Sequence, residues 1–421
     1  MDSAEGTSPL VEHLFRHQSG RLVASLTRLF GASHLEMAED VVQDTLLRAM
    51  REWPFRGIPD DPPAWLYRVA RNLAVDRLRR DARGLTLLQS NAALLRSEWT
   101  LSSTVREALD EQSVEDDQLR MMFACCHPAL PREQQVALAL RTLCGFGVPE
   151  IARAFMTNEE TINKRLHRGR TTFREIGHLE VPSSADLNGR MEHVLATIYL
   201  LFNEGYSATQ HADLIREDLI EEALRLADLL TRDPRTDRPE VRALLALMLY
   251  HTARGDARLD ADGAIVLLPE QDRTRWDRSL IRLADHHLEV ASVGEEVSAY
   301  HLEAAIAAVH VHAASYARTD HASLVTLYDR LWRIRPTPVV ALNRAIALGQ
   351  WKGPEAGLSA LEQLEGLDDL HLYHAARGDA LRDLKRMPEA RAAYTRALTL
   401  AHSPAESALL RRKLEGILDR S

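Results

Sequence analysis

Side chains able to bind DNA line one side of the segment 158–174. At about 100° per residue of an α-helix, Ile162, Leu166 and Phe173 share one face, which would pack against a domain core. The side chains available to phosphates or base edges are Thr161, Asn163, Lys164, Arg165 and Arg168. Because a short helix and a tight turn are expected just before it, within Pro149–Arg174, the segment predicts the recognition helix of a helix-turn-helix. The alternative is a charged, solvated helix in a bundle.

A second basic segment, Pro63–Arg83, has the same pattern. Its packed stripe consists of Leu66, Val69, Ala70 and Leu73. The side chains expected on the other side are Arg68, Arg71 and Arg79, with Asn72 at the flank. The stretch between the two basic segments is mostly acidic. Two basic helices of this kind predict two separate contacts on one duplex.

A third helix, expected at Ala38–Met50, presents an apolar residue outward. Val42, Leu46 and Ala49 share the face that packs. The opposite face carries Asp40, Gln43, Asp44 and Leu47. A leucine between carboxylates would anchor a partner helix, and the acids would select a basic partner. The alternative is an ordinary exposed leucine, which is common on protein surfaces.

Taken together, residues from about Leu10 to Ile176 resemble the bacterial extracytoplasmic-function (ECF) sigma factors. AEDVVQDTLLRA is similar to the helix by which that family binds core RNA polymerase. WLYRVARNLAVDRLRR is similar to the family's −10-element helix, and EIARAFMTNEETINKRLHRGR to its helix-turn-helix for the −35 element. The resemblance implies two partners, promoter DNA and core RNA polymerase, the latter contacted at the β′ clamp helices and the β flap.

The resemblance also assigns residues to these contacts. It implies that the β′ clamp helices are faced by Asp40, Gln43, Asp44 and Leu47. It implies that the −10 strand is bound by Phe55, Arg68, Arg71, Asn72, Arg77 and Arg79. The −35 element would be bound by Thr161, Asn163, Lys164, Arg165 and Arg168. The loop Phe55–Pro62 matches the family's loop that captures a flipped-out base, where Phe55, with Trp53 just before it, offers an aromatic face for stacking.

Composition predicts an all-α chain of two or three domains, because Ala, Leu and Arg dominate its 421 residues and the apolar spacing is helical nearly throughout. We expect a first domain at 10–83, an acidic linker at 84–117 and a helix-turn-helix domain at 118–177. The net charge of −9 would make the chain a poor binder of free DNA, which suits a sigma factor whose polymerase holds much of the DNA. The acidic stretch Glu107–Asp117 either mimics a nucleic-acid backbone inside the polymerase or is a solvated linker.

Residues 183–421 are expected to form an α-helical extension. Pro354-Glu355-Ala356 recurs 34 residues later as Pro388-Glu389-Ala390, the period of tetratricopeptide (TPR) repeats, which predicts TPR-like pairs at about 339–402. YLLFNEGYSA, PEQDRTRWDRSLI and VVALNRAIALGQWKGPEAGL resemble signatures of an ECF subgroup with a long C-terminal TPR-like extension. That resemblance implies that the extension regulates the sigma factor in cis. Its acids could cover the basic helices through an intramolecular contact.

No catalytic residue, metal or cofactor is expected, and the chain is not expected to be an enzyme, because no P-loop, dinucleotide fingerprint or nucleophile elbow is present. Cys125, Cys126 and Cys144 form no CxxC pair and are expected to be buried structural residues. The histidines considered as metal ligands and rejected on spacing are His286, His287, His301, His310 and His312. Asn203–Tyr206 either lines a ligand pocket or ends a helix at Gly205. No secretory signal or membrane-spanning run is visible, so we expect a cytoplasmic location and no membrane contact.

Three functions remain open from the sequence. A sigma factor would need polymerase to recognise DNA and would depend on Asp44 and Leu47. A stand-alone helix-turn-helix regulator with a TPR-type sensor would bind duplex DNA tightly by itself, and it leaves the faces of Ala38–Met50 and Pro63–Arg83 unexplained. An enzyme in the C-terminal half, with a DNA-binding module to target it, would need a polar cluster in a pocket.

Overall fold

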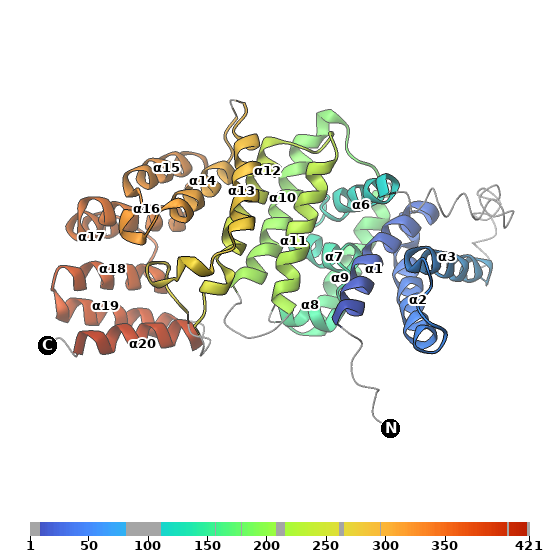
Figure 1. Cartoon of the computed structure of the whole chain (residues 1–421), viewed down its shortest axis with the longest axis horizontal. Coiled ribbons are helices and arrows are strands. Elements are labelled where there is room, and N and C mark those ends of the chain that lie inside the picture. The colour runs from blue at the N-terminus through green and yellow to red at the C-terminus, as the bar shows by residue number, and fades with distance from the viewer. Residues whose placement is uncertain are drawn as a thin grey trace, which may run out of the picture. The chain divides into compact units, whose positions relative to one another are not determined.

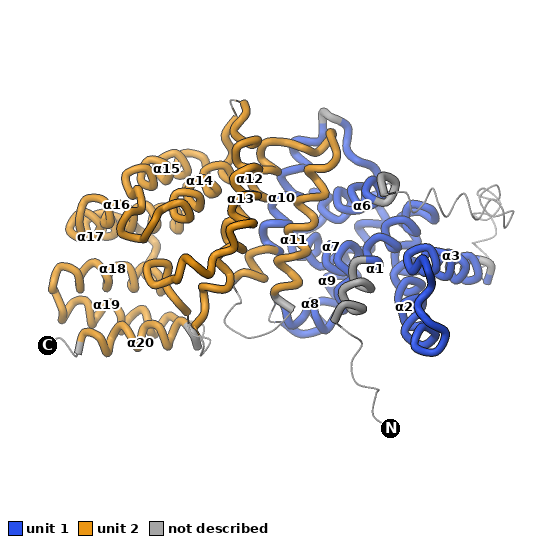
Figure 2. Tube along the Cα trace, viewed as in Figure 1, with its two compact units in different colours: residues 1–201 blue, residues 202–421 orange. Residues whose placement is uncertain are grey.

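The computed structural model describes residues 9–80, 111–155, 157–177, 179–207, 215–260, 265–294, 296–401 and 404–418. These residues form helices and turns, and among them there is no strand, only a single bridge between Leu259 and Ile265. The prediction of an all-α chain is confirmed. The chain divides into an N-terminal unit, Met1–Leu201, and a C-terminal unit, Phe202–Ser421 (Figure 2). None of the described helices is long and apolar enough to cross a lipid bilayer.

Three long helices open the N-terminal unit: α1 (Pro9–Phe30), α2 (Leu35–Arg56) and α3 (Pro62–Arg80) (Figure 1). The short 3-10 helix η1 (Ala32–His34) joins the first two. Glycines with positive φ follow two of the helices, Gly31 after α1 at 92° and Gly57 after α2 at 82°, a conformation that glycine adopts without strain. Leu26, Val42 and Leu66, one from each helix, are completely buried, so the three apolar stripes meet in one core.

Four further helices complete the second group of this unit: α6 (Glu111–Cys125), α7 (Arg132–Thr142), α8 (Val148–Ala154) and α9 (Glu159–Ile176). The side chain of Asn158 caps α9 by accepting a hydrogen bond from the Thr161 amide at 2.8 Å. The pair α8 and α9 has the helix-turn-helix order expected from the sequence. The three cysteines, Cys125, Cys126 and Cys144, are buried and unbridged, as expected.

The described end of the predicted linker is helical. Residues 81–110, which include Glu107 and Asp110, lie outside the described residues, and α6 begins at Glu111. Asp117 is only 3% exposed and pairs with Arg28 of α1 at 2.5 Å. Both expectations for this stretch, a solvated linker and a mimic of nucleic acid, are therefore wrong for Asp117, because its carboxylate is used inside the N-terminal unit.

The helix α10 (Ser184–Ser207) begins in the N-terminal unit and packs on the second helical group. Arg190 donates to the carbonyl oxygen of Phe123 at 2.6 Å, and the Thr197 hydroxyl donates to the Gln135 side chain at 3.1 Å. The boundary between the two units, after Leu201, falls inside this helix. The expectation that Gly205 ends a helix is wrong, since α10 continues to Ser207 and Gly205 is buried within it.

The C-terminal unit is a succession of helices. They are α11 (Ile215–Arg232), α12 (Pro239–Thr252), α13 (Arg278–Ala291), α14 (Ala299–His312), α15 (His321–Ile334), α16 (Pro338–Lys352), α17 (Pro354–Glu362), α18 (His371–Asp383), α19 (Met387–Leu400) and α20 (Pro404–Leu418). Four 3-10 turns lie between them: η3 (Gly255–Ala257), η4 (Leu268–Glu270), η5 (Arg273–Arg275) and η6 (Tyr316–Arg318). Successive helices lie side by side, as in helical repeats (Figure 1).

The 34-residue repeat corresponds to two helical pairs, α16 with α17 and α18 with α19. Pro354 and Pro388 stand in the first turn of α17 and α19, where a missing amide costs nothing. In the second pair the ring of Tyr394 lies against Gly378, and its hydroxyl donates to Asp379 at 2.6 Å. The small residue of the repeat thus lets two helices approach closely around a buried aromatic ring.

Candidate polymerase and DNA interfaces

The outward face of α2 gathers the four residues predicted to bind a partner helix. Asp40, Asp44 and Leu47 are 56%, 52% and 49% exposed, and Gln43 is exposed beside them. On the other side of the same helix, Val41, Val42, Thr45 and Ala49 are completely buried. The leucine therefore belongs to no core of its own unit, and its carboxylate neighbours lie on the solvent-exposed side of the helix.

Arg77 of α3 lies against this acidic face. Its guanidinium donates to Asp40 at 3.1 Å and to Asp44 at 2.9 Å. All three side chains are more than a third exposed, so the pairing is weak and exchangeable. The arrangement brings together a residue predicted for the −10 strand and two predicted for the polymerase.

The other predicted residues of α3 divide into exposed and buried ones. Arg68 and Asn72 are exposed, and the side chain of Arg79 lies outside what the structure describes. The expectation that Arg71 projects outward is wrong, because its side chain is 3% exposed. Tyr67, Ala74 and Leu78 are buried at helical spacing before and after it, so position 71 falls on the packed stripe, which is wider than the sequence pattern indicated.

Phe55 does not lie in a loop, as the sequence suggested, but in the last turn of α2, which continues through Pro54 to Arg56. Its ring is 89% exposed and is thus available for stacking. Trp53, by contrast, is buried and packs edge-on against Trp65 of α3, with ring centroids 5.6 Å apart. Its burial removes Trp53 from the aromatic groups that a base can reach.

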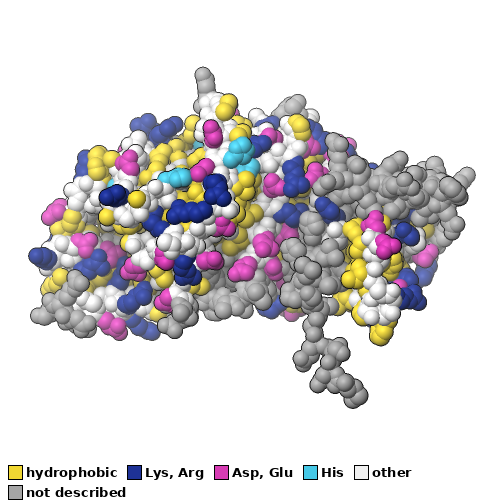
Figure 3. All heavy atoms as spheres, in the orientation of Figure 1, with side chains coloured by type: hydrophobic (Ala, Val, Ile, Leu, Met, Phe, Trp, Pro, Cys, Tyr) yellow, Lys and Arg dark blue, Asp and Glu magenta, His cyan; other side chains and the backbone are white. Residues whose placement is uncertain are grey.

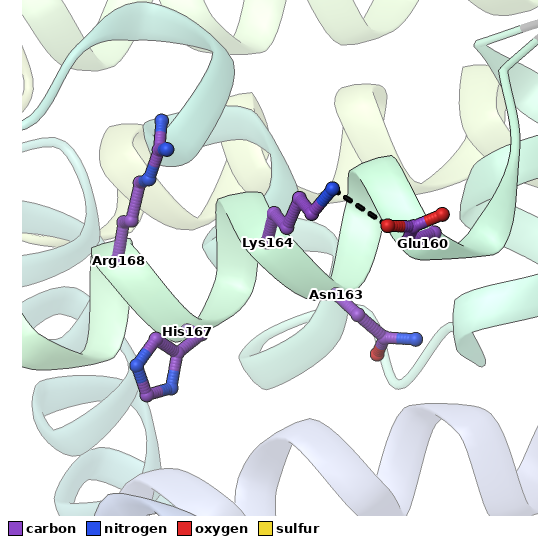
Figure 4. Close-up of a pocket in the computed structure, with 5 residues that line it drawn as sticks. All are labelled: Glu160, Asn163, Lys164, His167 and Arg168. Atoms are coloured by element: carbon purple, nitrogen blue, oxygen red, sulfur yellow. Dashed lines mark hydrogen bonds and ion pairs between the residues drawn. The ribbon is translucent and has the colours of Figure 1, made fainter.

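The cationic side of α9 faces solvent, and its apolar side is buried. Ile162, Leu166 and Phe173 are buried, whereas Asn163, Lys164 and Arg168 are exposed and Thr161 and Arg165 are half-buried. Figure 4 shows Asn163, Lys164, His167 and Arg168 projecting from this helix around a shallow hollow. His167 was missed in the sequence, although its position one helical turn after Asn163 and Lys164 places it on the same surface.

Two cations of this surface are held by nearby acids. Lys164 pairs with Glu160 at 2.6 Å, and Arg165 pairs with Glu133 of α7 at 2.7 Å. Both acids are at least 70% exposed, so these pairs contribute little and their cations can be transferred to a phosphate. Within the described ranges, no three His, Cys, Asp or Glu side chains gather in a way that could hold a metal ion.

Comparison with known proteins agrees with this arrangement. Residues 14–84 match the family model of sigma-70 region 2, and residues 120–173 match that of sigma-70 region 4. Over 180 residues the chain is 30% identical to the ECF RNA polymerase sigma factor SigL of Mycobacterium tuberculosis, covering 42% of this chain and 95% of that protein. The chain belongs to the ECF sigma factors. A further relative, the ECF RNA polymerase sigma factor SigX of Bacillus subtilis, is 25% identical over 34% of this chain and 71% of its own length.

The extension of this sigma factor also has relatives. Residues 190–292 match a family of unknown function, DUF6596. An uncharacterised protein of Rhizobium meliloti, R00370, is 40% identical over 93% of this chain and 92% of its own length. Sigma regions and helical extension therefore occur together in at least one other protein.

Regions 2 and 4 of this sigma factor contact each other within the N-terminal unit. Glu39 of α2, 3% exposed, accepts a hydrogen bond from Arg170 of α9 and lies 4.0 Å from Arg141 of α7. Burial raises the pKa of Glu39, although both arginines act in the opposite direction. Gly20 of α1 lies directly against the Leu143 backbone. Sequence reasoning missed this contact; its one signal is an acid at position 39, between the buried residues Ala38 and Val41.

Proposed function

We propose that this sigma factor binds core polymerase through the outward face of α2 and promoter DNA through α3 and α9, and that its extension regulates it in cis. As an ECF sigma factor the chain acts in transcription initiation, with core RNA polymerase and promoter DNA as partners. The proposal concerns which groups perform these tasks.

The observation that carries the proposal is the two-sided character of α2. One side is packed, and the other exposes Leu47 one turn after Asp44 and two turns after Asp40. An exposed apolar side chain with an acidic rim fits a helix with a basic rim and an apolar groove, because hydrophobic contact supplies affinity and the charges supply orientation. This is the surface that we assign to the β′ clamp helices.

The DNA contacts are assigned to side chains that are exposed or half-buried. On α3 and at the end of α2 these are Arg68, Asn72, Arg77 and the ring of Phe55, for the −10 strand. On α9 they are Thr161, Asn163, Lys164, Arg165 and Arg168, for the −35 element, and we add His167 because it lines the same hollow. We leave Arg71 out of the set that contacts DNA, because its buried side chain supports the helix instead.

Cis regulation is supported by the helix that begins the extension. The first turns of α10 pack on region 4 through Arg190 and Thr197, so region 4 includes residues beyond the family's helix-turn-helix. In addition, the contact of Glu39 with Arg170 keeps regions 2 and 4 together in the free chain. Polymerase that binds α2 would therefore meet an N-terminal unit in which regions 2 and 4 are in contact.

The test is run-off transcription with bacterial core polymerase on candidate promoters, beginning with the DNA upstream of the gene itself. The full chain is compared with a chain that ends at Ser207, which retains α10 on region 4. We expect specific transcripts, and the ratio between the two chains gives the sign of control by the extension. Tight duplex binding without polymerase, and no transcript from either chain, would replace the proposal with a stand-alone regulator.

A further inference from the structure

Three arginines of the C-terminal unit lie close together and form no ion pair with a carboxylate of the described residues. They are Arg254 and Arg258, which follow α12, and Arg273 at η5, and we call them the arginine cluster. Elsewhere in this unit guanidinium groups pair with carboxylates, for example Arg242 with Asp237 at 2.6 Å and Arg335 with Glu303 at 2.7 Å. In the part of the chain that the structure describes, no carboxylate forms an ion pair with any member of the cluster.

Neutral groups fix these arginines in place. Arg258 lies over the ring of Tyr206, 3.7 Å from its centroid, and donates to the Tyr206 carbonyl oxygen at 2.8 Å. Arg273 lies over Trp276 at 4.4 Å and donates to the carbonyl oxygens of His310 and Ala313, both at 2.8 Å. These contacts orient the guanidinium groups and leave their charge uncompensated.

Arg254 also lies near Trp276. Its guanidinium is 5.7 Å from the Trp276 ring, and its Nε donates to the Gln271 side chain at 3.2 Å. Burial and the neighbouring Arg258 and Arg273 all lower its pKa. Arg254 thus lies near two other arginines and has a neutral amide as its hydrogen-bond partner, an arrangement that favours binding of an anion.

Buried nitrogen atoms near the cluster also lack hydrogen-bond partners. Buried nitrogen atoms with no hydrogen bond include Nδ1 of His251, Nδ1 of His310 and Nη2 of Arg273. The pKa of His251 is lowered to about 3 by burial and by Arg254 and Arg258, and that of His310 to about 4 by burial, Arg254, His321 and Arg273. Both imidazoles are therefore neutral at pH 7 and can donate a proton to a hydrogen bond without adding repulsion.

The cluster draws on several elements of the unit. Tyr206 comes from the end of α10, His251 from α12, Arg273 from η5 and His310 from the last turn of α14. The three arginines are half-buried, so a solute can reach them. Lys and Arg side chains are visible at the surface of the C-terminal unit (Figure 3). The sequence had left Asn203–Tyr206 open as a ligand-pocket lining, and the structure brings Tyr206 to this place.

We propose that the arginine cluster is the binding site of a small oxyanion with two or more negative charges, a phosphate ester or a polycarboxylate. Guanidinium groups bind both chemistries through paired N–H donors, and here the donors are already oriented by aromatic rings and carbonyl groups. An anion would neutralise the mutual repulsion and provide acceptors for the unpartnered nitrogen atoms. This binding is separate from the sigma activity and can be measured without polymerase or DNA.

The experiment uses isothermal titration calorimetry and thermal unfolding of the full chain with four probes: inorganic phosphate, pyrophosphate, citrate and, as a monovalent reference, chloride. We expect saturable binding of at least one multivalent probe and a rise in Tm of roughly 5 °C at a hundred times its Kd. Preference for pyrophosphate over citrate would identify a phosphate ligand, and the reverse a carboxylate. Binding no better than that of chloride for all probes would overturn the proposal.

Two variants separate a binding role from a structural one. In Arg254→Gln the affinity should fall at least tenfold, while Tm without anion stays the same or rises, because an uncompensated charge has been removed. Arg275→Gln is the matched control, since Arg275 is an exposed arginine two residues from Arg273 on η5. If Arg254→Gln lowers the Tm of the anion-free protein and leaves the affinity unchanged, the cluster is structural and the proposal is wrong.

Discussion

Leu47 is the side chain that best separates the polymerase-binding role from the packing of α2, because it is half exposed between Asp44 and Arg48 and packs in no core. Leu47→Asp should reduce affinity for core polymerase at least thirtyfold, corresponding to a loss of about 2 kcal/mol or more at a central contact. Fluorescence anisotropy with labelled sigma factor measures this. Leu283→Asp, at a leucine of similar exposure in α13, should leave both affinity and Tm unchanged. Equal affinities for the two variants would remove Leu47 from the interface.

Arg168 provides the corresponding test for DNA. It is exposed on α9 and lines the same hollow as Asn163 and Lys164. Arg168→Ala should weaken binding of polymerase holoenzyme to the −35 element by about 1–3 kcal/mol if the side chain contacts a base, and the loss should depend on the base sequence. Electrophoretic mobility shifts on matched and mutated −35 elements measure it. Arg174→Ala, nearly two turns further along and also exposed, is the control; a loss equal for all sequences would assign Arg168 to a phosphate.

At this scale the sequence predicts exposure better than it predicts contacts. Asp40, Asp44, Leu47 and the apolar face of α9 lie as the helical period required, because each is decided by its own helix. Arg71 and Trp53 differ because their burial depends on neighbouring helices that a single-helix pattern does not contain. The arginine cluster could not be predicted for the same reason, since the groups that hold its arginines include Tyr206 and His310, which come from distant helices.

Helix α1 approaches α7 so closely at Gly20 that no side chain fits. A Cβ at this position would lie 2.7 Å from the Leu143 carbonyl carbon, and backbone cannot move aside as a side chain can. Gly20→Ala should therefore separate regions 2 and 4 and speed alkylation of Cys144, the residue after Leu143, at least tenfold, with helical content unchanged by circular dichroism.

The matched control is Gly189→Ala in α10, where a Cβ meets nothing within 4 Å. Its thiol reactivity should equal that of the unmodified chain. Burial raises the pKa of Cys125 and raises that of Cys126 to about 12, so neither thiol should contribute to alkylation in the closed form. An unchanged rate in Gly20→Ala would show that the contact between α1 and α7 does not hold the two regions together.

In the second TPR-like pair, α18 and α19 depend on Gly378. A Cβ there would lie 2.6 Å from two carbon atoms of the Tyr394 ring, which is buried and bonded to Asp379. Gly378→Ala should lower the free energy of unfolding by about 1–3 kcal/mol, the usual cost of overpacking. Denaturant titration followed by circular dichroism measures it. Gly416→Ala in α20, where the space is open, should be neutral or stabilise by roughly 0.5–1 kcal/mol.

Helix boundaries could be predicted where the local sequence signals agree with tertiary packing. The helix expected from about Asn158 begins there, and the repeated Pro354 and Pro388 each lie in the first turn of a helix. Gly205 shows the limit of such signals, because burial within α10 outweighs the helix-breaking tendency of glycine. The helix that begins at Glu111 was not predicted because its acidic residues indicated a solvated linker. In the structure, an acid such as Asp117 is instead compensated by Arg28 of another helix.

Across the molecule, stability should fall in mild acid because His251 and His310 stay neutral in the folded chain. Their pKa values, about 3 and about 4, lie below the ordinary value of 6.5, so between pH 6.5 and 4 the unfolded chain binds more protons and is favoured as pH falls. The full slope is about 1.4 kcal/mol per pH unit for each histidine. Because both rings are partly exposed, we expect about half of this, roughly 2 kcal/mol in total between pH 6.5 and 5.

Urea titrations at pH 7 and pH 5 measure this loss. The double variant His251→Gln, His310→Gln lacks both groups, so its stability should depend less on pH by the same amount. If the two chains lose equal stability on acidification, other groups of the folded chain, and not these imidazoles, determine the acid sensitivity.

The position of the unit boundary inside α10 has a consequence for gene fusion. A recombination event that joins this extension to another sigma factor must either cut α10 or carry the helix with it. A fusion point before Arg190 removes the side chains that hydrogen-bond to Phe123 and Gln135. Region 4 is then left with exposed polar groups and apolar surface that α10 normally covers. Transfer should therefore succeed when region 4 and α10 move as one inherited block, and chimaeric sigma factors built by exchange at Ser184 should be recovered mainly as insoluble protein.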